Sequence, residues 1–209
     1  MAMDNMAIYI DMSKCTACRS CQVACKSWNQ LKAEQTENRG SHENPPDLSA
    51  NTWNRIRWIE QMKNGSIAWT FFSERCRHCD PPDCKYMADT YVEGAIIKDP
   101  SGAVLFTEKI KGIDPDEIMS ACPFNIPRYD PKTGMAFKCN FCIDRINFGL
   151  PPACVKACST GALNFGEKSK MMALARSRIA ELGDKAALYP GEGYNVFWAL
   201  PDKELLKHI

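Results

Sequence analysis

The spacing of the cysteines is the feature that most constrains how this chain of 209 residues can fold. Its 12 cysteines fall into three groups of four, with none left over. The first group has the spacing C-x2-C-x2-C-x3-C and consists of Cys15, Cys18, Cys21 and Cys25. The other groups consist of Cys76, Cys79, Cys84 and Cys122, and of Cys139, Cys142, Cys154 and Cys158. Groups of four thiolates are typical of metal centres, whereas disulfides are typical of small secreted domains. We therefore expect these cysteines to bind metal.

Composition places the chain among globular proteins and excludes several classes of function. Hydrophobic residues make up 45% and charged residues 24%, and the length is sufficient for an apolar core. Lys and Arg number 26 against 25 Asp and Glu, a formal net charge of +1 without basic blocks, which argues against nucleic acid as a partner. No stretch approaches 18 consecutive apolar residues, so we expect no membrane span. The first six residues lack the basic and apolar segments of an export signal.

The first group of cysteines distinguishes between iron–sulfur clusters and zinc. Zinc ribbons use pairs of C-x2-C arms that meet around one tetrahedral ion. Residues 15–25 instead match the bacterial ferredoxin run, in which three thiolates hold one [4Fe–4S] cluster and the fourth cysteine ligates the other cluster of the pair. The spacing therefore favours iron–sulfur clusters, and a zinc-stabilised interaction module is the alternative from a different class.

Four stretches resemble the iron–sulfur electron-transfer subunits of molybdenum/tungsten bis-pterin oxidoreductases, such as formate dehydrogenase, dimethyl sulfoxide reductase and polysulfide reductase. These stretches are residues 15–25, 76–84, 121–128 and 152–162, and the resemblance spans residues 6–166. Within the family, the sequence is most similar to the small subunit of soluble, two-subunit formate dehydrogenases. The Asn44-Pro45-Pro46-Asp47 segment and the missing membrane anchor favour that choice.

The sequence departs from the family pattern at four positions where a ferredoxin spacing predicts cysteines. These positions are Ala88, Gly112, Pro115 and Ile118. If each cluster takes three ligands from one motif and one from its pseudosymmetric mate, all four positions belong to a single site. The family pattern has sixteen cysteines and four clusters. In this chain all four ligands of one cluster are missing and no unpaired cysteine remains, so we expect three [4Fe–4S] clusters.

The crossed pairing that the resemblance implies assigns every cysteine to one of three clusters. Cluster 1 is held by Cys15, Cys18, Cys21 and Cys158, cluster 2 by Cys139, Cys142, Cys154 and Cys25, and cluster 3 by Cys76, Cys79, Cys84 and Cys122. We expect no catalytic residue, because the sequence offers no nucleophile–base pair and no phosphate-binding glycine loop. His78 lies within the Cys76–Cys79 segment, where we expect it to pack or hydrogen-bond and not to ligate a cluster.

This pairing predicts an α+β fold of two ferredoxin-like units, the second degenerate and inserted into the first, with long loops and a C-terminal helix. The first unit comprises residues 1–51 and 131–166 with two clusters, the second residues 52–130 with one cluster, and residues 167–209 form the C-terminal helix and tail. Strands are expected at residues 8–10, 55–61, 67–72, 94–97 and 103–106, with a turn at Asn64-Gly65. A helix is expected over residues 171–182 with Gly183 as its cap, and residues 194–200 form a packed strand or an interface segment. Residues 32–51 form a surface loop or a loop that clasps a partner subunit.

Charges near the ligands are expected to adjust the clusters electrostatically. Each oxidised cluster with four thiolates carries about −2, so three clusters bring the formal net charge from +1 to about −5. Nearby cations favour the reduced, more negative cluster and raise its potential. The cations close to ligands in sequence are Lys14, Arg19, Lys26, Arg77, Lys85, Lys138 and Arg145, and some of them are expected only to face water.

The resemblance implies an electron-transfer subunit that forms a heterodimer with a catalytic subunit carrying a molybdenum or tungsten pterin cofactor. That partner oxidises formate to CO2, and the clusters pass electrons to an external acceptor such as a multihaem cytochrome. The alternative keeps this relay but exchanges the partner for a sulfur-compound reductase or a hydrogenase. We expect a periplasmic location, reached by folded export with a signal-bearing partner, and otherwise a cytoplasmic one.

Overall fold

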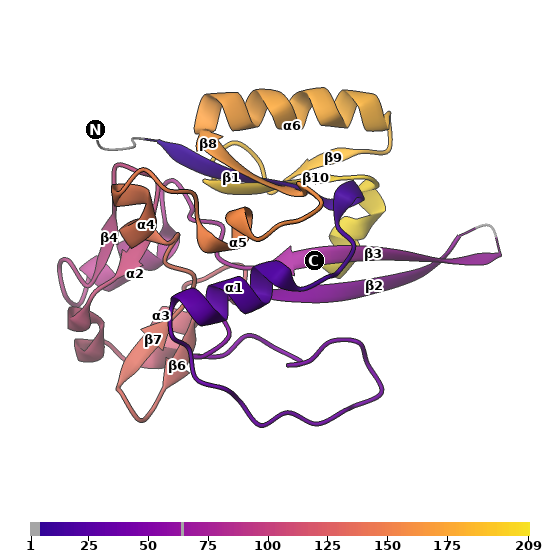
Figure 1. Cartoon of the computed structure of the whole chain (residues 1–209). Coiled ribbons are helices and arrows are strands. Elements are labelled where there is room, and N and C mark those ends of the chain that lie inside the picture. Colours follow the sequence, from indigo (N-terminus) through magenta and orange to yellow (C-terminus); the bar gives the residue numbers. More distant parts are fainter. Residues whose placement is uncertain (1–4, 64) are drawn as a thin grey trace.

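A mixed four-stranded sheet, covered on one side by the long helix α6, forms one layer of the molecule in this computed structural model (Figure 1). The structure describes residues 5–63 and 65–209. The order of the strands is β8-β1-β10-β9, with β8 at Leu163–Glu167, β1 at Met6–Asp11, β10 at Val196–Leu200 and β9 at Ala187–Tyr189. Strand β1 pairs in parallel with β10 and antiparallel with β8, so the sheet joins both ends of the chain.

The two central strands consist of almost uninterrupted apolar residues because both faces of the sheet are covered. Every residue of β1 and of β10 is buried. Side chains alternate between the faces, so Ile8 and Trp198 enter the largest apolar core, whereas Tyr9 and Phe197 pack against α6. The predicted strand at residues 8–10 is confirmed, and residues 194–200 contain a packed strand.

Helix α6, Lys168–Leu182, confirms the predicted C-terminal helix. Its cap is Gly183 with φ +88°, a backbone conformation that glycine adopts without strain. Met171 and Ala175 are buried against the sheet, but Leu174 is 50% exposed, so the apolar face is narrower than the periodicity predicts. A short 3-10 helix at Lys203–His208 follows β10.

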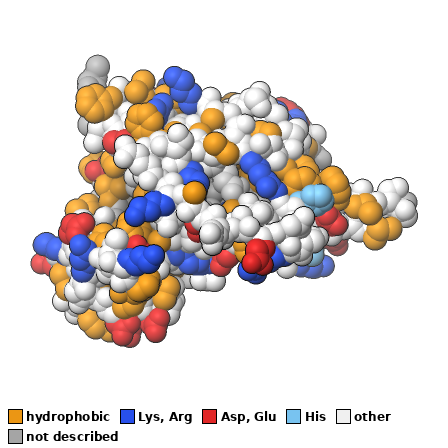
Figure 2. Space-filling view, turned by 60° about the horizontal axis from the view of Figure 1, so that its bottom comes forward, with side chains coloured by type: hydrophobic (Ala, Val, Ile, Leu, Met, Phe, Trp, Pro, Cys, Tyr) orange, Lys and Arg blue, Asp and Glu red, His pale blue; other side chains and the backbone are white. Residues whose placement is uncertain are grey.

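A long antiparallel hairpin projects from the body of the molecule (Figure 1). It consists of β2, Arg55–Lys63, and β3, Ser66–Glu74, and confirms the two predicted strands. Its base packs into the same core as β1 and β10, because Ile56, Ile59 and Phe72 belong to that core. Hydrophobic side chains are exposed on the projecting part (Figure 2), namely Met62, Ile67 and Trp69. Asn64 of the predicted turn lies outside the described residues, as do residues 1–4 of the segment in which no export signal is expected.

The central part of the chain folds around a second apolar core. Helices α2, Asp83–Asp89, and α3, Pro115–Ser120, pack against each other beside the strand pair β4, Ile96–Lys98, and β5, Val104–Phe106. This pair confirms the strands predicted around residues 99–102. The 3-10 helix Glu108–Gly112 and the pair β6, Arg128–Asp130, and β7, Met135–Phe137, complete this part. The buried residues of its core are Ala88, Ala95, Ile96, Val104, Ile110, Ile113, Ile118, Met135 and Ala136.

Short helices carry or flank the remaining cysteines. They are the 3-10 helix Met12–Lys14, α1 at Ser20–Trp28, α4 at Ile143–Asn147 and α5 at Ala153–Lys156. Helix α1 packs against α5 although about 130 residues separate them in the sequence. The fold is thus a mixed α+β arrangement of several small sheets with a C-terminal helix.

The loop predicted over residues 32–51 has no helix or strand apart from one isolated bridge at Ser49, and it is fixed by carboxylates. Glu34 accepts hydrogen bonds from Lys26 at 3.0 Å and from Ser49 and Thr52 at 2.5 Å. Farther along, Glu43 accepts from Arg55 at 2.7 Å. A surface loop is confirmed here, whereas a contact of this loop with a partner stays a prediction.

Candidate metal centres

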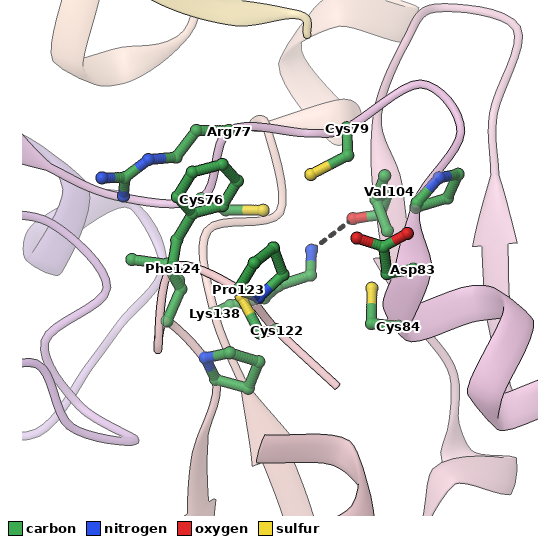
Figure 3. A pocket seen from close by; sticks show the side chains of 13 residues that line it. Cys76, Arg77, Cys79, Asp83, Cys84, Val104, Cys122, Pro123, Phe124 and Lys138 are labelled. Atoms are coloured by element: carbon green, nitrogen blue, oxygen red, sulfur yellow. Dashed lines mark hydrogen bonds between the residues drawn. The ribbon is translucent and has the colours of Figure 1, made fainter. Parts of the chain in front are cut away.

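Four thiols of the central region line one cavity (Figure 3). Cys76 and Cys79 follow β3, Cys84 lies on α2, and Cys122 follows α3. Their side chains border a common space, whose wall also includes Lys138. Burial raises the pKa of Cys79 to about 12, and the charges of the other three thiols act in the same direction. We call these four cysteines thiol set 3.

A second group of thiols forms where both ends of the cysteine pattern meet. Burial raises the pKa of Cys15 to about 11, and the charges of Cys21, Cys158 and Cys18 add to the increase. The Cys15–Cys21 segment turns tightly, with Ala17 and Arg19 in the left-handed region at φ 54° and 61°. Cys18 is the exposed member of the group. These residues, Cys15, Cys18, Cys21 and Cys158, form thiol set 1.

A third group lies deepest in the molecule. Cys139, Cys142, Cys154 and Cys25 are all buried. The pKa of Cys25 is raised well above its ordinary value, first by burial and then by the charges of Cys139, Cys154 and Cys142. Cys142 adopts φ 51° before α4, so the chain reverses sharply between Cys139 and that helix. These four cysteines are thiol set 2.

The sets follow one another in a defined order. The charge of Cys154 in set 2 contributes to the raised pKa of Cys21 in set 1, because α1 and α5 pack together. Cys139 of set 2 packs with Cys76 of set 3 in a small apolar cluster. Set 2 therefore lies between sets 1 and 3. Among residues 5–63 and 65–209, no three His, Cys, Asp or Glu side chains lie close enough together to hold a single metal ion.

Four cations are buried without a carboxylate partner in the described part of the chain. They are Arg75, Arg77, Lys138 and Arg145, which are between 1% and 7% exposed. Arg55 is as deeply buried, but it pairs with Glu43 at 2.7 Å and with Glu74 at 2.5 Å. A buried cation without a counter-charge costs several kcal/mol, about 3–5 where one partner of a buried pair is removed. The unpaired cations therefore require negative charge from another source.

Two of these cations lie beside thiols. Arg75 donates from Nη1 to the Cys154 sulfur at 3.0 Å, and Lys138 borders the cavity of set 3, where its charge opposes the increase in the pKa of Cys84. The guanidinium of Arg77 points away from the sulfur atoms of set 3 (Figure 3), although its charge still acts on the pKa of Cys122. The Lys138 amine also donates to the carbonyl of Val104 at 2.5 Å, a bond visible in Figure 3. Aromatic rings also contact three of the cations: Arg145 stacks on Trp28 with 4.3 Å between its guanidinium carbon and the ring centroid, Arg77 lies 4.7 Å from the Phe124 centroid, and the Lys138 amine lies 4.6 Å from that of Phe106.

Buried donors without partners point to the same requirement. Asn54 Nδ2, Arg75 Nε, Arg77 Nε and His78 Nε2 have no hydrogen-bond partner among the described residues. His78 is fully buried and accepts the backbone N–H of Val104 on Nδ1 at 2.9 Å, so the proton lies on Nε2. Burial and the charges of Lys138, Lys98 and Arg75 hold the pKa of His78 well below its ordinary value, and the ring is neutral. His78 thus packs and hydrogen-bonds, as expected.

Anionic [4Fe–4S] clusters fit this combination of groups. Each set offers four thiols, the cations beside them lack carboxylate partners, and unpaired N–H groups are the donors that cluster sulfur atoms accept. The sequence predicts the roles of Arg77 and Lys138 but misses Arg75 and Asn54, although Arg75 directly precedes Cys76. Three other predicted cations pair with carboxylates instead: Lys14 with Asp11, Lys26 with Glu34 and Lys85 with Asp89.

Comparison with known proteins agrees with this chemistry. Residues 67–168 match the family described as the 4Fe-4S dicluster domain. The fold and its thiols thus define an iron–sulfur electron-transfer protein. None of the described helices is both long and apolar enough to cross a membrane.

The relatives narrow this class. The chain is 46% identical to formate dehydrogenase 2 subunit beta (cytochrome c-553) of Nitratidesulfovibrio vulgaris, over 95% of this chain and 94% of that protein. It is 49% identical to formate dehydrogenase subunit beta of Megalodesulfovibrio gigas, over 85% and 84%. Identity to the nitrate-inducible formate dehydrogenase iron-sulfur subunit of Escherichia coli is 39%, over 90% and 65%. The chain belongs to the family of iron–sulfur (beta) subunits of formate dehydrogenases.

Proposed function

We propose that this chain relays electrons through three [4Fe–4S] clusters held by thiol sets 1, 2 and 3. The observation that carries the proposal is the grouping of twelve cysteines, eleven of them buried or half-buried, into three sets of four beside cations that lack carboxylate partners among the described residues. Each bound cluster supplies a one-electron redox centre. The residues of this chain hold the three centres in a row and surround them with positive charge and N–H donors.

The order of the relay is set 1, set 2, set 3 or its reverse. The charge interaction between Cys21 and Cys154, and the packing of Cys139 with Cys76, support this order. The ends differ from the middle in exposure, because the four thiols of set 2 are buried, whereas Cys18 of set 1 is exposed. Three of the thiols of set 3 are half-buried. Electrons therefore enter at one outer set and leave at the other.

The proposed donor is a catalytic subunit with a molybdenum or tungsten pterin cofactor, which oxidises formate to CO2 and a proton and releases two electrons. This chain passes them one at a time to an external acceptor such as a multihaem cytochrome. Family membership supports the donor, and the Nitratidesulfovibrio relative carries cytochrome c-553 in its name. Folded export with a signal-bearing catalytic subunit would bring the complex to the periplasm. Fractionation of cells in which that signal is deleted tests this location, because export that persists would contradict it.

The proposed architecture has two ferredoxin-like units. Residues 1–51 and 131–166 carry clusters 1 and 2, residues 52–130 carry cluster 3, and residues 167–209 form the C-terminal part. The separate apolar core of the central region supports the division. Two features connect these units. The base of the β2–β3 hairpin packs into the core of the first unit, and β10 of the C-terminal part lies inside the sheet of that unit.

Capture of the catalytic subunit tests the proposed donor. The complex is purified anaerobically through this chain, and formate-dependent reduction of a viologen dye is measured, with hydrogen and thiosulfate as control substrates. We expect reduction with formate and a pterin cofactor in the captured partner. A partner without pterin, or activity with hydrogen alone, would contradict the assignment.

Ligand replacement tests the crossed pairing. Cys158→Ser should alter the same EPR signal as Cys15→Ser, because both residues belong to set 1. Cys25→Ser should instead alter the signal of the cluster held by Cys139, Cys142 and Cys154. Serine can still offer an oxygen ligand, so a shifted potential or a three-iron form counts as alteration. If Cys15→Ser and Cys25→Ser change one common signal that Cys158→Ser leaves intact, the pairing is wrong.

A further inference from the structure

The side chain of Arg75 lies between thiol sets 1 and 2. It is 1% exposed, and its Nη1 donates to the sulfur of Cys154 in set 2 at 3.0 Å. Its Nη2 donates to Asn54 Oδ1 at 2.9 Å and to the hydroxyl of Ser73. Ser73 also donates to Asn54 Oδ1 at 3.0 Å, so the guanidinium is held by a fixed buried network.

The charge of Arg75 reaches both sets. Among charged groups it is the strongest influence on Cys21 of set 1 and on Cys139 of set 2. Asn54, which orients Arg75, also lies at Cys21, and its Nδ2 has no hydrogen-bond partner in residues 5–63 and 65–209. In set 3, Arg75 is not among the charges that act on Cys84 and Cys122; Lys138 acts on Cys84 and Arg77 acts on Cys122. Arg75 is thus a cation shared by sets 1 and 2. Arg77 is the buried arginine whose charge acts on set 3.

Arg75 has no carboxylate partner among the described residues, unlike the equally buried Arg55 with Glu43 and Glu74. A charge of this kind is stable only where negative groups surround it. The thiolates of sets 1 and 2 are the negative groups in contact with it. Reduction adds one electron to a cluster and takes its total charge, thiolates included, from about −2 to about −3. A fixed cation beside the cluster favours the more negative state.

We propose that Arg75 is a positioning residue that raises the reduction potentials of clusters 1 and 2 together, as one charge shared between them. The inference rests on the ligand sets of the proposed function. Its consequence is that a single side chain raises the reduction potentials of two neighbouring clusters of the relay. The reduction potential of cluster 3 is set independently by Arg77 and Lys138.

Redox titration of the complete complex, followed by EPR, tests this inference. The variants are Arg75→Gln, which removes the charge, Arg75→Lys, which keeps it, and Arg77→Gln as the matched control at cluster 3. In Arg75→Gln we expect the ratio of reduced to oxidised cluster at a given potential to fall at least tenfold for clusters 1 and 2. For a one-electron couple this is a shift of about 59 mV. Arg75→Lys should restore most of the loss, and Arg77→Gln should shift cluster 3 alone.

A variant at Asn54 provides a second, independent measurement. Asn54→Asp places a carboxylate on the oxygen that accepts the Arg75 hydrogen bond, and it should lower the potentials of clusters 1 and 2 while leaving cluster 3 unchanged. If Arg75→Gln does not assemble its clusters, Asn54→Asp decides the question. A shift confined to one cluster, an equal shift of all three, or no shift would overturn the inference. A wild-type complex without three separate cluster signals would instead refute the proposed function.

Discussion

The outer region, residues 1–51 and 131–166, and the central region, residues 52–130, contain different numbers of cysteines, and their interiors differ in composition. Eight thiols from distant parts of the sequence meet in the outer region beside helices α1, α4 and α5. The central region has only four, around one cavity. Where the family pattern expects four more ligands, Ala88 and Ile118 are 0% and 1% exposed in an apolar core. These two side chains pack in the apolar core beside α2 and α3, and we propose that this core takes the place of a fourth cluster.

This difference teaches which part of the molecule depends on metal. Apolar side chains stabilise the central region from within, since about nine buried residues contribute their hydrophobic burial there. In the outer region, Arg75 donates to Cys154 of α5, and its buried charge is favourable only beside an anionic centre. The two remaining positions of the lost site carry no packing role of this kind, because Gly112 is exposed and Pro115 begins α3.

Removal of iron should have the largest effect, and it should separate the two regions. Burial raises the pKa of Cys139 to about 11 and that of Cys142 to about 12, so these thiols are neutral near pH 7 once the clusters are gone. Arg75 then remains buried without counter-charge, at a cost of about 3–5 kcal/mol. We expect backbone amides of α1 and α5 to exchange hydrogen more than about 100-fold faster in the apoprotein, as measured by mass spectrometry.

The amides around Ile96 and Ile118 are the internal control for that measurement. Because an apolar core protects them, their exchange should slow far less on reconstitution with iron than that of α1. Equal loss of protection in both regions would contradict the comparison.

Truncation of a side chain in the apolar core should have a smaller effect, which changes stability and leaves the iron content unchanged. Ile118→Ala removes a buried side chain from the core between α2 and α3 and should lower the free energy of unfolding by about 2–5 kcal/mol. The iron content should stay unchanged, because the residue belongs to none of the thiol sets. Val23→Ala, at a side chain that is 65% exposed, is the control and should change stability by less than about 0.5 kcal/mol. An unchanged free energy of unfolding in Ile118→Ala would contradict the account, because the side chain would then not stabilise this region.

The pH dependence of the apoprotein should give the smallest effect. Burial raises the pKa of Cys79 and of Cys84 from 9.0 to about 12, so the folded state holds protons that the unfolded state releases. The stability that these thiols contribute is full below about pH 9 and is lost as pH rises toward 12. Urea denaturation of the apoprotein should therefore show a lower midpoint at about pH 10.5 than at about pH 8. The holoprotein, whose thiolates are bound, should not show this decrease between the same two pH values.

The cysteine spacing predicts which segments of the chain lie close together, because the four ligands of one metal cluster must meet around it. The β2–β3 and β4–β5 strand pairs and α6 occur where the sequence predicts them, whereas the assignment of the twelve cysteines to three clusters stays a prediction. Local signals suffice for such elements, since a turn glycine or a helical periodicity acts over a few residues.

Long-range features could not be predicted in the same way. Strand β10 lies between β1 and β9, a placement that no local pattern in residues 194–200 encodes. Arg75 was missed because its role depends on a contact with Cys154, 79 residues away in the sequence. Sequence proximity to a ligand is a poor guide to charge placement, since Lys85 follows Cys84 directly and yet pairs with Asp89.

The iron and acid-labile sulfide content of the anaerobically purified protein tests the central claim most directly. Three four-iron clusters predict about twelve iron and twelve sulfide per chain, with no substantial zinc. About sixteen of each would contradict the claim, because a cluster would then occupy the place of Ala88 and Ile118, and about eight would mean that one of the three thiol sets binds no cluster.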